Sequence, residues 1–142
     1  MRALLDVNVL IALTDANHAF HNAAKHWIVE HGESGWATCP LTQNGCIRIL
    51  SQPGYPAPLR LPDALARLAR MCAAAAHEFW PDDVSLLDAS VANHAHIHGP
   101  RQITDLYLLA LAVEHSGRLV TFDAPIPLSA IRGAQKKHLA VI

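Results

Sequence analysis

Short apolar segments alternate with amphipathic segments along most of this chain, and that alternation constrains its fold more than any other feature. Buried strands are predicted where a brief apolar run ends at a turn or a polar residue; these are residues 2–5, 35–39, 118–122 and 139–142. Apolar residues at helical spacing predict helices over residues 8–15, 19–31, 41–50, 62–76 and 104–116. Strands joined through helices form right-handed βαβ units, so we expect an α/β protein, a three-layer α/β/α sandwich around a mostly parallel sheet.

The segment that precedes the last long helix has weaker patterns. Residues 77–80 and 84–87 are short strand candidates on either side of a Pro-Asp-Asp turn, and residues 89–98 favour a helix that ends at a Gly-Pro pair. On such a helix, His94 and His98 share a face but have no third ligand nearby in the sequence. Surface histidines are therefore favoured over a zinc site.

Length and composition indicate one globular domain that spans residues 1–142, because 51% of the 142 residues are hydrophobic and only 16% are charged. No membrane span is expected. The apolar run 61–76 is interrupted by charges at helical spacing, and Asp6 interrupts the apolar start of the chain, which argues against a signal peptide. We therefore expect a cytoplasmic protein.

The net charge of −1 is unusual for a protein that binds nucleic acid, because such proteins commonly have an excess of basic residues. Bound metal ions would supply the missing positive charge. A basic cluster of Arg132, Lys136, Lys137 and His138 is either a local attraction for phosphates or a solvated surface.

Three aspartates are placed where the predicted strands and helices meet. Asp6 follows the first strand, next to Asn8 as a candidate N-cap. Asp105 follows Thr104, another candidate N-cap, and Asp123 follows the strand 118–122. Taken singly, each has an ordinary explanation as a capping, helix-dipole or turn residue.

Together the three aspartates predict a metal site. Ligands of open parallel sheets bind beyond the carboxyl ends of the strands, where these side chains would converge. Carboxylates that lie close together repel one another unless a cation separates them. Mg²⁺ or Mn²⁺ prefers such oxygen ligands and can activate water for hydrolysis of a phosphodiester.

Four segments, in this order and spacing, resemble the PIN-domain family and most of all its VapC-type toxins. They are LLDVNVLIAL, PLTQNGCIRIL, FWPDD and QITDLYLLALAVEHSGRLVTFD. The resemblance covers nearly the whole chain. It implies a Mg²⁺- or Mn²⁺-dependent endoribonuclease that acts as the toxin of a toxin–antitoxin pair, is inhibited by a cognate antitoxin and forms a homodimer.

The resemblance also implies roles for individual residues. Asp6 and Asp105 would be the main metal ligands and Asp123 would complete the site, while Asn8 and Thr121 would orient carboxylates or a water molecule.

One position departs from the family pattern. Gln43 stands where the family usually has a glutamate, and would be the fourth, uncharged corner of the catalytic site. A glutamine lacks the negative charge that favours hard cations and cannot act as a base. It is either a natural variant or an introduced substitution, and activity would be weakened in both cases. Restoring the glutamate is then expected to raise RNA cleavage.

Two other functions remain open. A catalytically silent PIN module that binds RNA or a protein partner is consistent with Gln43. A phosphatase of the haloacid-dehalogenase type is less consistent, because its general acid would have to stand at Asn8.

Overall fold

The computed structural model describes residues 1–123 and 125–142, and at its centre is a five-stranded sheet in which every pairing is parallel. The strands are β1 (Ala3–Leu5), β2 (Trp36–Thr38), β3 (His77–Phe79), β4 (Arg118–Thr121) and β5 (Leu139–Val141). Their order is β3-β2-β1-β4-β5, so the chain starts in the central strand. From β1 the chain continues to β2 and β3 on one side of the sheet, and only later to β4 and β5 on the other side. Ligands of open α/β sheets bind where the strand order reverses in this way, which here is between β1 and β4.

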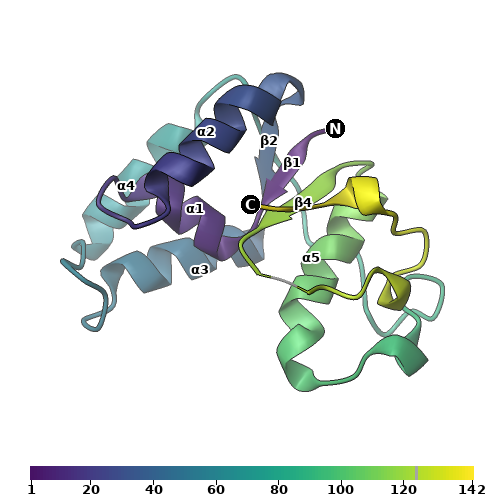
Figure 1. Ribbon diagram of the computed structural model, residues 1–142. Coiled ribbons are helices and arrows are strands. Elements are labelled where there is room, and N and C mark those ends of the chain that lie inside the picture. The colour runs from purple at the N-terminus through teal and green to yellow at the C-terminus, as the bar shows by residue number, and fades with distance from the viewer. Residues whose placement is uncertain (124) are drawn as a thin grey trace.

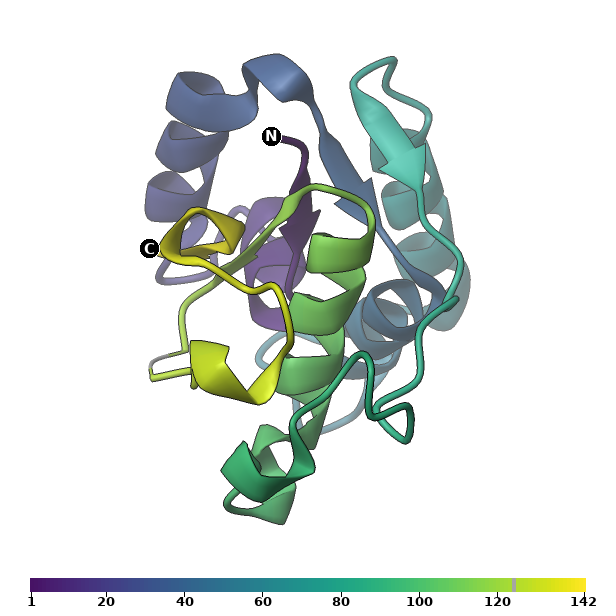
Figure 2. The ribbon, with the colours of Figure 1, turned by 90° about the vertical axis from the view of Figure 1, so that its right-hand side faces the viewer.

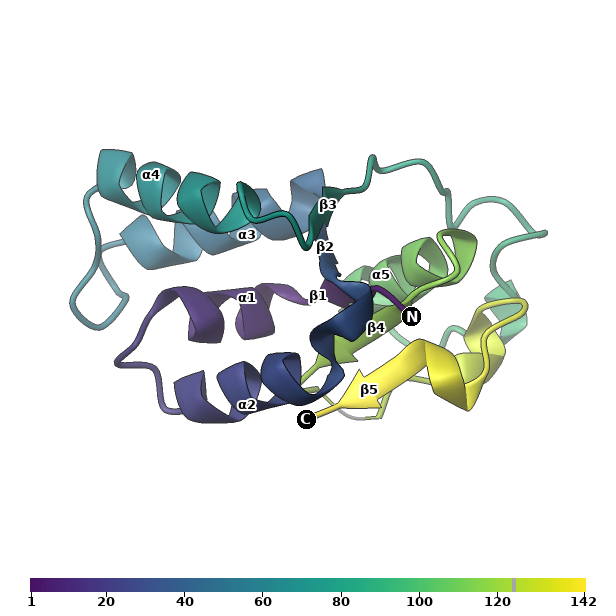
Figure 3. The same ribbon diagram turned by 90° about the horizontal axis from the view of Figure 1, so that it is seen from above.

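Helices cover both faces of this sheet (Figure 1). One face carries α1 (Val7–Thr14), α2 (His21–His31), α3 (Pro40–Ser51) and α4 (Leu61–Cys72), and the other carries α5 (Ile103–Glu114). The view from above separates the same two groups of helices (Figure 3). The predicted three-layer α/β/α sandwich is confirmed, with a sheet that is wholly parallel.

Two hydrophobic cores hold the layers together because successive strand residues point to opposite faces of a sheet. Leu4 and Leu119 pack towards α5, whereas Leu5 and Val120 pack towards α1 to α4. Trp80, which follows β3, is buried on the α5 side.

The caps of two helices differ from those predicted. The N-cap of α1 is Asp6, whose side chain accepts a hydrogen bond from the backbone N–H of Val7, so Asn8 lies inside the first turn. Helix α5 begins at Ile103, which puts Thr104 inside the helix as well. Asp6 therefore satisfies a free N–H at the start of α1, as N-cap carboxylates do.

The segment between β3 and α5 contains neither the strand predicted at 84–87 nor the α-helix predicted at 89–98. Residues 84–87 have no partner strand and form an irregular loop that ends in a turn. The Asp88 side chain binds the backbone N–H and hydroxyl of Ser90, a local bond that competes with helix formation. Backbone pairing of Ala92 with Ile131 then draws this segment against the C-terminal part of the chain (Figure 2).

Because that helix does not form, His94 and His98 do not share a helix face as predicted. Only a short 3₁₀ turn, His94–His96, forms there, and the His94 ring bonds to the carbonyl of Leu86. Within residues 1–123 and 125–142, no helix has the length and apolar character needed to cross a membrane.

Candidate functional site

Asp6 connects the central strand to the first helix and is almost wholly buried, with 4% of its surface exposed. One carboxylate oxygen, Oδ1, accepts a hydrogen bond from the Val7 N–H at 2.6 Å, and the other, Oδ2, accepts one from the Thr121 hydroxyl at 2.7 Å. Burial raises the pKa of this carboxyl group, and the negative charge of Asp123 adds to the increase. The two hydrogen bonds lower the pKa and oppose that effect.

Asp105 lies in the first turn of α5, on the other face of the sheet from α1. Burial raises the pKa of its carboxyl group to about 6, with further contributions from the negative charges of Asp6 and Asp123. A carboxyl group with such a pKa is close to half protonated just below neutral pH in the absence of a cation.

Asp123 is exposed and follows β4 by two residues. Its backbone N–H donates a hydrogen bond to the Thr121 hydroxyl oxygen at 3.0 Å, and the Asn8 amide lies 3.5 Å from its Oδ2. Thr121 is fully buried and contacts both Asp6 and the backbone of Asp123. Both residues that were expected to orient the acids therefore lie where they can do so.

The three predicted carboxylates meet at one place. Each of Asp6, Asp105 and Asp123 offers an oxygen within 4.8 Å of the others, and no other such group of potential metal ligands occurs within the described residues. They come from the carboxyl end of β1, the start of α5 and the carboxyl end of β4. The oxygen donor set fits a hard divalent cation, as does the raised pKa of Asp105, which burial causes first and the negative charges of Asp6 and Asp123 increase further.

Gln43, the predicted fourth corner of the site, makes its described side-chain contacts with β2 and α4, and its role beside the acids stays a prediction. Its side-chain amide donates to the Thr38 hydroxyl at 2.9 Å and lies 3.9 Å from the sulfur of Cys72, in a pocket between α3 and α4. Residues of a helix are separated by about 100° each. Gln43 consequently lies on the opposite side of α3 from Gly45 and Arg48, which line the space next to Val7.

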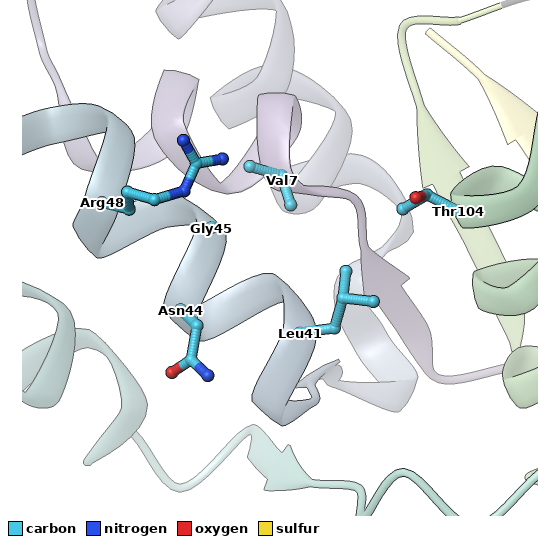
Figure 4. A pocket seen from close by; sticks show the side chains of 6 residues that line it. All are labelled: Val7, Leu41, Asn44, Gly45, Arg48 and Thr104. Atoms are coloured by element: carbon cyan, nitrogen blue, oxygen red, sulfur yellow. The ribbon is translucent and has the colours of Figure 1, made fainter. Parts of the chain in front are cut away.

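That second space is a groove beside the acidic cluster, with a volume of about 460 Å³. Figure 4 shows the six residues that line it, which come from α1, α3 and the start of α5: Val7, Leu41, Asn44, Gly45, Arg48 and Thr104. Val7 and Thr104 are the chain neighbours of Asp6 and Asp105. The sequence patterns do not single out Asn44 or Arg48 as site residues, although their spacing of four places them on one face of the helix.

A wholly parallel sheet between two helical layers, with acids gathered at its central carboxyl edge, defines an α/β protein suited to metal-dependent hydrolysis. The chain belongs to the PIN-domain family, whose model matches residues 3–127.

Its relatives place it in the VapC-type group of that family. It is similar to Ribonuclease VapC44 of Mycobacterium tuberculosis strain H37Rv, with 53% identity over 142 residues and 100% of both chains covered. It is also 46% identical to Ribonuclease VapC39 of the same strain over 134 residues, which cover 94% of this chain and 96% of that protein.

Solved structures show the same fold at much lower identity. A crystal structure of VapC20 from M. tuberculosis, described as a toxin that cleaves the sarcin–ricin loop, has a TM-score of 0.59 at 12% identity, covering 87% of this chain and 89% of that one. VapBC2 from Rickettsia felis, bound to a DNA fragment from its promoter, has a TM-score of 0.58 at 11% identity with the same coverage.

Proposed function

We propose that this chain is the endoribonuclease toxin of a VapC-type toxin–antitoxin pair and hydrolyses RNA phosphodiester bonds at Asp6, Asp105 and Asp123 with Mg²⁺ or Mn²⁺. The observation that carries the proposal is the cluster of three carboxylates within 4.8 Å, in a chain 53% identical to a protein named a ribonuclease. Neither the carboxylate cluster nor the sequence similarity would by itself support the whole proposal.

Each residue has a role that its contacts support. Asp6, Asp105 and Asp123 would hold the cation, which when bound activates water and offsets the charge of the phosphodiester. Thr121 fixes Oδ2 of Asp6 and the Val7 N–H fixes Oδ1, so the carboxylate has a set orientation beside the other two acids. Asn8 contacts Asp123 and limits the positions of this exposed side chain.

Cleavage of a labelled oligoribonucleotide with Mn²⁺ tests the proposal. Asp105→Asn and Asp123→Asn should each abolish cleavage, as should chelation of the metal, because each removes a negatively charged ligand or the cation itself. Asp63→Asn is the matched control, since Asp63 is an exposed acid in the first turn of α4. Cleavage that survives both cluster variants would contradict the proposal.

A catalytically silent PIN module that binds RNA or a protein partner is the second candidate. The observation in its favour is that an uncharged residue, Gln43, stands where the family pattern usually has a glutamate, so that the described acidic group consists of three carboxylates. Calorimetric titration with Mn²⁺ separates the two functions. A nuclease should bind the metal saturably and lose that binding in Asp6→Asn, whereas a silent module should show no binding that depends on the carboxylates.

We further infer that the antitoxin docks on the face formed by α1, α2 and α4. An apolar pocket of about 300 Å³ lies there, lined by Leu13, Ile28, Trp36, Arg70, Met71 and Ala74. A hydrophobic groove of this kind accepts the apolar face of an amphipathic helix. The VapBC2 structure, which has the same fold and is named for both VapB and VapC, supports the existence of a paired antitoxin.

Co-purification with the product of the reading frame immediately upstream tests this docking face. Ile28→Glu should abolish co-purification because it places a charge in the pocket. Val29→Glu should not, since Val29 is the next residue and already 75% exposed. Equal behaviour of the two variants would contradict the proposed face.

The resemblance to VapC-type toxins leads us to propose that this chain is a cytoplasmic homodimer. Light scattering of the purified chain should give twice the mass of 15.4 kDa, and a monomeric mass would contradict the dimer. Fractionation of cells that express the chain tests the location, because recovery with the membranes or outside the cell would contradict a cytoplasmic protein.

A further inference from the structure

The groove beside the acidic cluster combines an apolar floor with one cationic side chain. Val7, Leu41 and Gly45 provide the floor, and Arg48 provides the charge (Figure 4). The floor depends on Gly45, because a Cβ atom at this position would lie 2.9 Å from Cγ2 of Val7. The absence of a side chain therefore allows α3 to approach α1 closely.

The guanidinium group of Arg48 is available to a ligand. Arg48 is exposed, and in the described part of the chain none of the three ion pairs involves it. No described carboxylate therefore neutralises its charge in an ion pair, although the groove adjoins two acids of the cluster through Val7 and Thr104, the chain neighbours of Asp6 and Asp105.

We propose that this groove holds the RNA strand next to the acidic cluster, and that Arg48 binds a backbone phosphate of that strand with Asn44 as a polar neighbour. The inference rests on the proposed function and identifies a positioning residue for its substrate. An arginine presents paired donors that match phosphate oxygens. The apolar floor is suited to the flat face of a base.

The charge distribution favours a phosphate at Arg48 over a ligand without charge. The chain has a net charge of −1, and its acidic cluster repels a polyanion until a cation is bound. A positive charge in the groove attracts the strand where it enters the site and fixes the position of the bond to be cleaved.

Salt-dependent binding of a labelled, mixed-sequence oligoribonucleotide to Arg48→Ala tests the proposal. The measurement uses an Asp105→Asn background, so that no cleavage is expected. Arg48→Ala should raise Kd by about three- to tenfold. It should also reduce the slope of log binding constant against log salt by about 0.7, the value for one phosphate contact on a single strand. Arg48→Lys should keep that slope, since it keeps the charge.

Arg60→Ala is the matched control, because Arg60 is an exposed arginine at the start of α4, outside the groove. It should leave both Kd and slope unchanged. Equal effects of Arg48→Ala and Arg60→Ala, including no effect of either, would overturn the proposal.

Cleavage kinetics provide a second measurement that separates positioning from loss of folding. In the chain with its acids intact, Arg48→Ala should raise KM more than it lowers kcat and leave Tm unchanged. An unchanged KM would overturn the role of Arg48. If the wild-type chain cleaves no RNA, the proposed activity fails, and the binding comparison still decides whether the groove holds the strand.

Discussion

Thr121 connects two of the three acids although it carries no charge. Its hydroxyl donates to Asp6 and accepts from the backbone N–H of Asp123, and it is fully buried. A hydroxyl group that donates to a carboxylate favours the charged form, which is the form a metal ligand needs. At the scale of single residues, the site therefore depends on a neutral side chain as well as on its acids.

Thr121→Val should weaken Mn²⁺ binding by about 10- to 100-fold, the usual effect of removing a partner that orients a metal ligand. Valine keeps the shape of threonine and removes the hydroxyl group. Thr121→Ser is the control and should retain most of the affinity because it restores the hydroxyl. Isothermal titration measures both variants, and equal affinities of Thr121→Val and the wild type would contradict this role.

Asp105 predicts how stability changes with pH in the metal-free protein. Its folded-state pKa is raised to about 6 from an ordinary value of 3.8. A raised carboxyl pKa means that the folded state holds its proton more tightly than the unfolded state. The contribution of this group to stability is therefore complete below about pH 4 and is lost as the pH rises through about 6.

Thermal melting across that pH range should show the loss in the wild type and a flatter profile in Asp105→Asn, which cannot titrate. Saturating Mn²⁺ should restore at pH 7 the stability that the metal-free wild type loses between low pH and pH 7. The cation then replaces the proton as the partner of the carboxylates. Parallel profiles for the two metal-free proteins would contradict the assignment to Asp105.

The acids of the site could be predicted from the sequence, whereas the orientation of Gln43 could not. Asp6 and Asp123 follow buried strands, and the carboxyl ends of neighbouring parallel strands necessarily meet at one edge of the sheet. Gln43 was assigned by family pattern alone. Which face of α3 points to the acids depends on the packing of α4, and no local pattern in the sequence contains that information.

Helix α3 presents different chemistry on its two long faces. One face, with Gln43 and Ile47, lines the pocket shared with α4, and the other, with Gly45 and Arg48, lines the groove beside the acids. Its buried residues Cys46 and Leu50 belong to the core shared with α1. At the scale of elements, substitutions on the two faces should have separable effects on stability and on RNA binding.

Gln43→Glu should leave Mn²⁺-dependent cleavage unchanged, in contrast to the increase that the family pattern alone would predict. The substitution removes the amide donor to Thr38 and should cost about 1 kcal/mol of stability. Chemical denaturation and a cleavage assay on the same preparation measure both effects. A sharp gain in cleavage would show that this side chain reaches the acids in the active state.

The long helices and the buried strands could be predicted because their apolar periodicity agrees with the face that each one buries. Residues 84–98 could not, because long-range contacts determine their conformation. Val91 and Asn93 exchange backbone hydrogen bonds with Arg132 and Ala130, which are distant in the sequence. Such contacts override a weak local preference for strand or helix.

The whole molecule is divided by its sheet into two hydrophobic cores, one on each side. Strand β1 contributes residues to both, as does β4. The acidic cluster lies where these strands end, so its carboxylates come from elements on both sides of the sheet. Metal binding should accordingly stabilise both layers together.

Unfolding of residues 1–142 should be a single transition that Mn²⁺ shifts to a higher temperature. A metal concentration of about a hundred times Kd adds about 2.7 kcal/mol. For a chain of this size, that corresponds to an increase in Tm of about 5–10 °C. Asp6→Asn should remove the increase. Far-UV and near-UV circular dichroism should give coincident transitions, and separate transitions would contradict one cooperative domain.

The position of β1 at the centre of the sheet also affects when the protein becomes functional during synthesis. Asp6 and its hydrogen-bond partner Thr121 are 115 residues apart in the chain. A ribosome that adds about 5–20 residues per second needs roughly 6–23 s to make that stretch. Until β4 has emerged, the first strand lacks one of its two neighbours and the cluster of acids does not exist. A nuclease built in this order cannot cut the messenger RNA that encodes it until β4 has been translated and has joined the sheet.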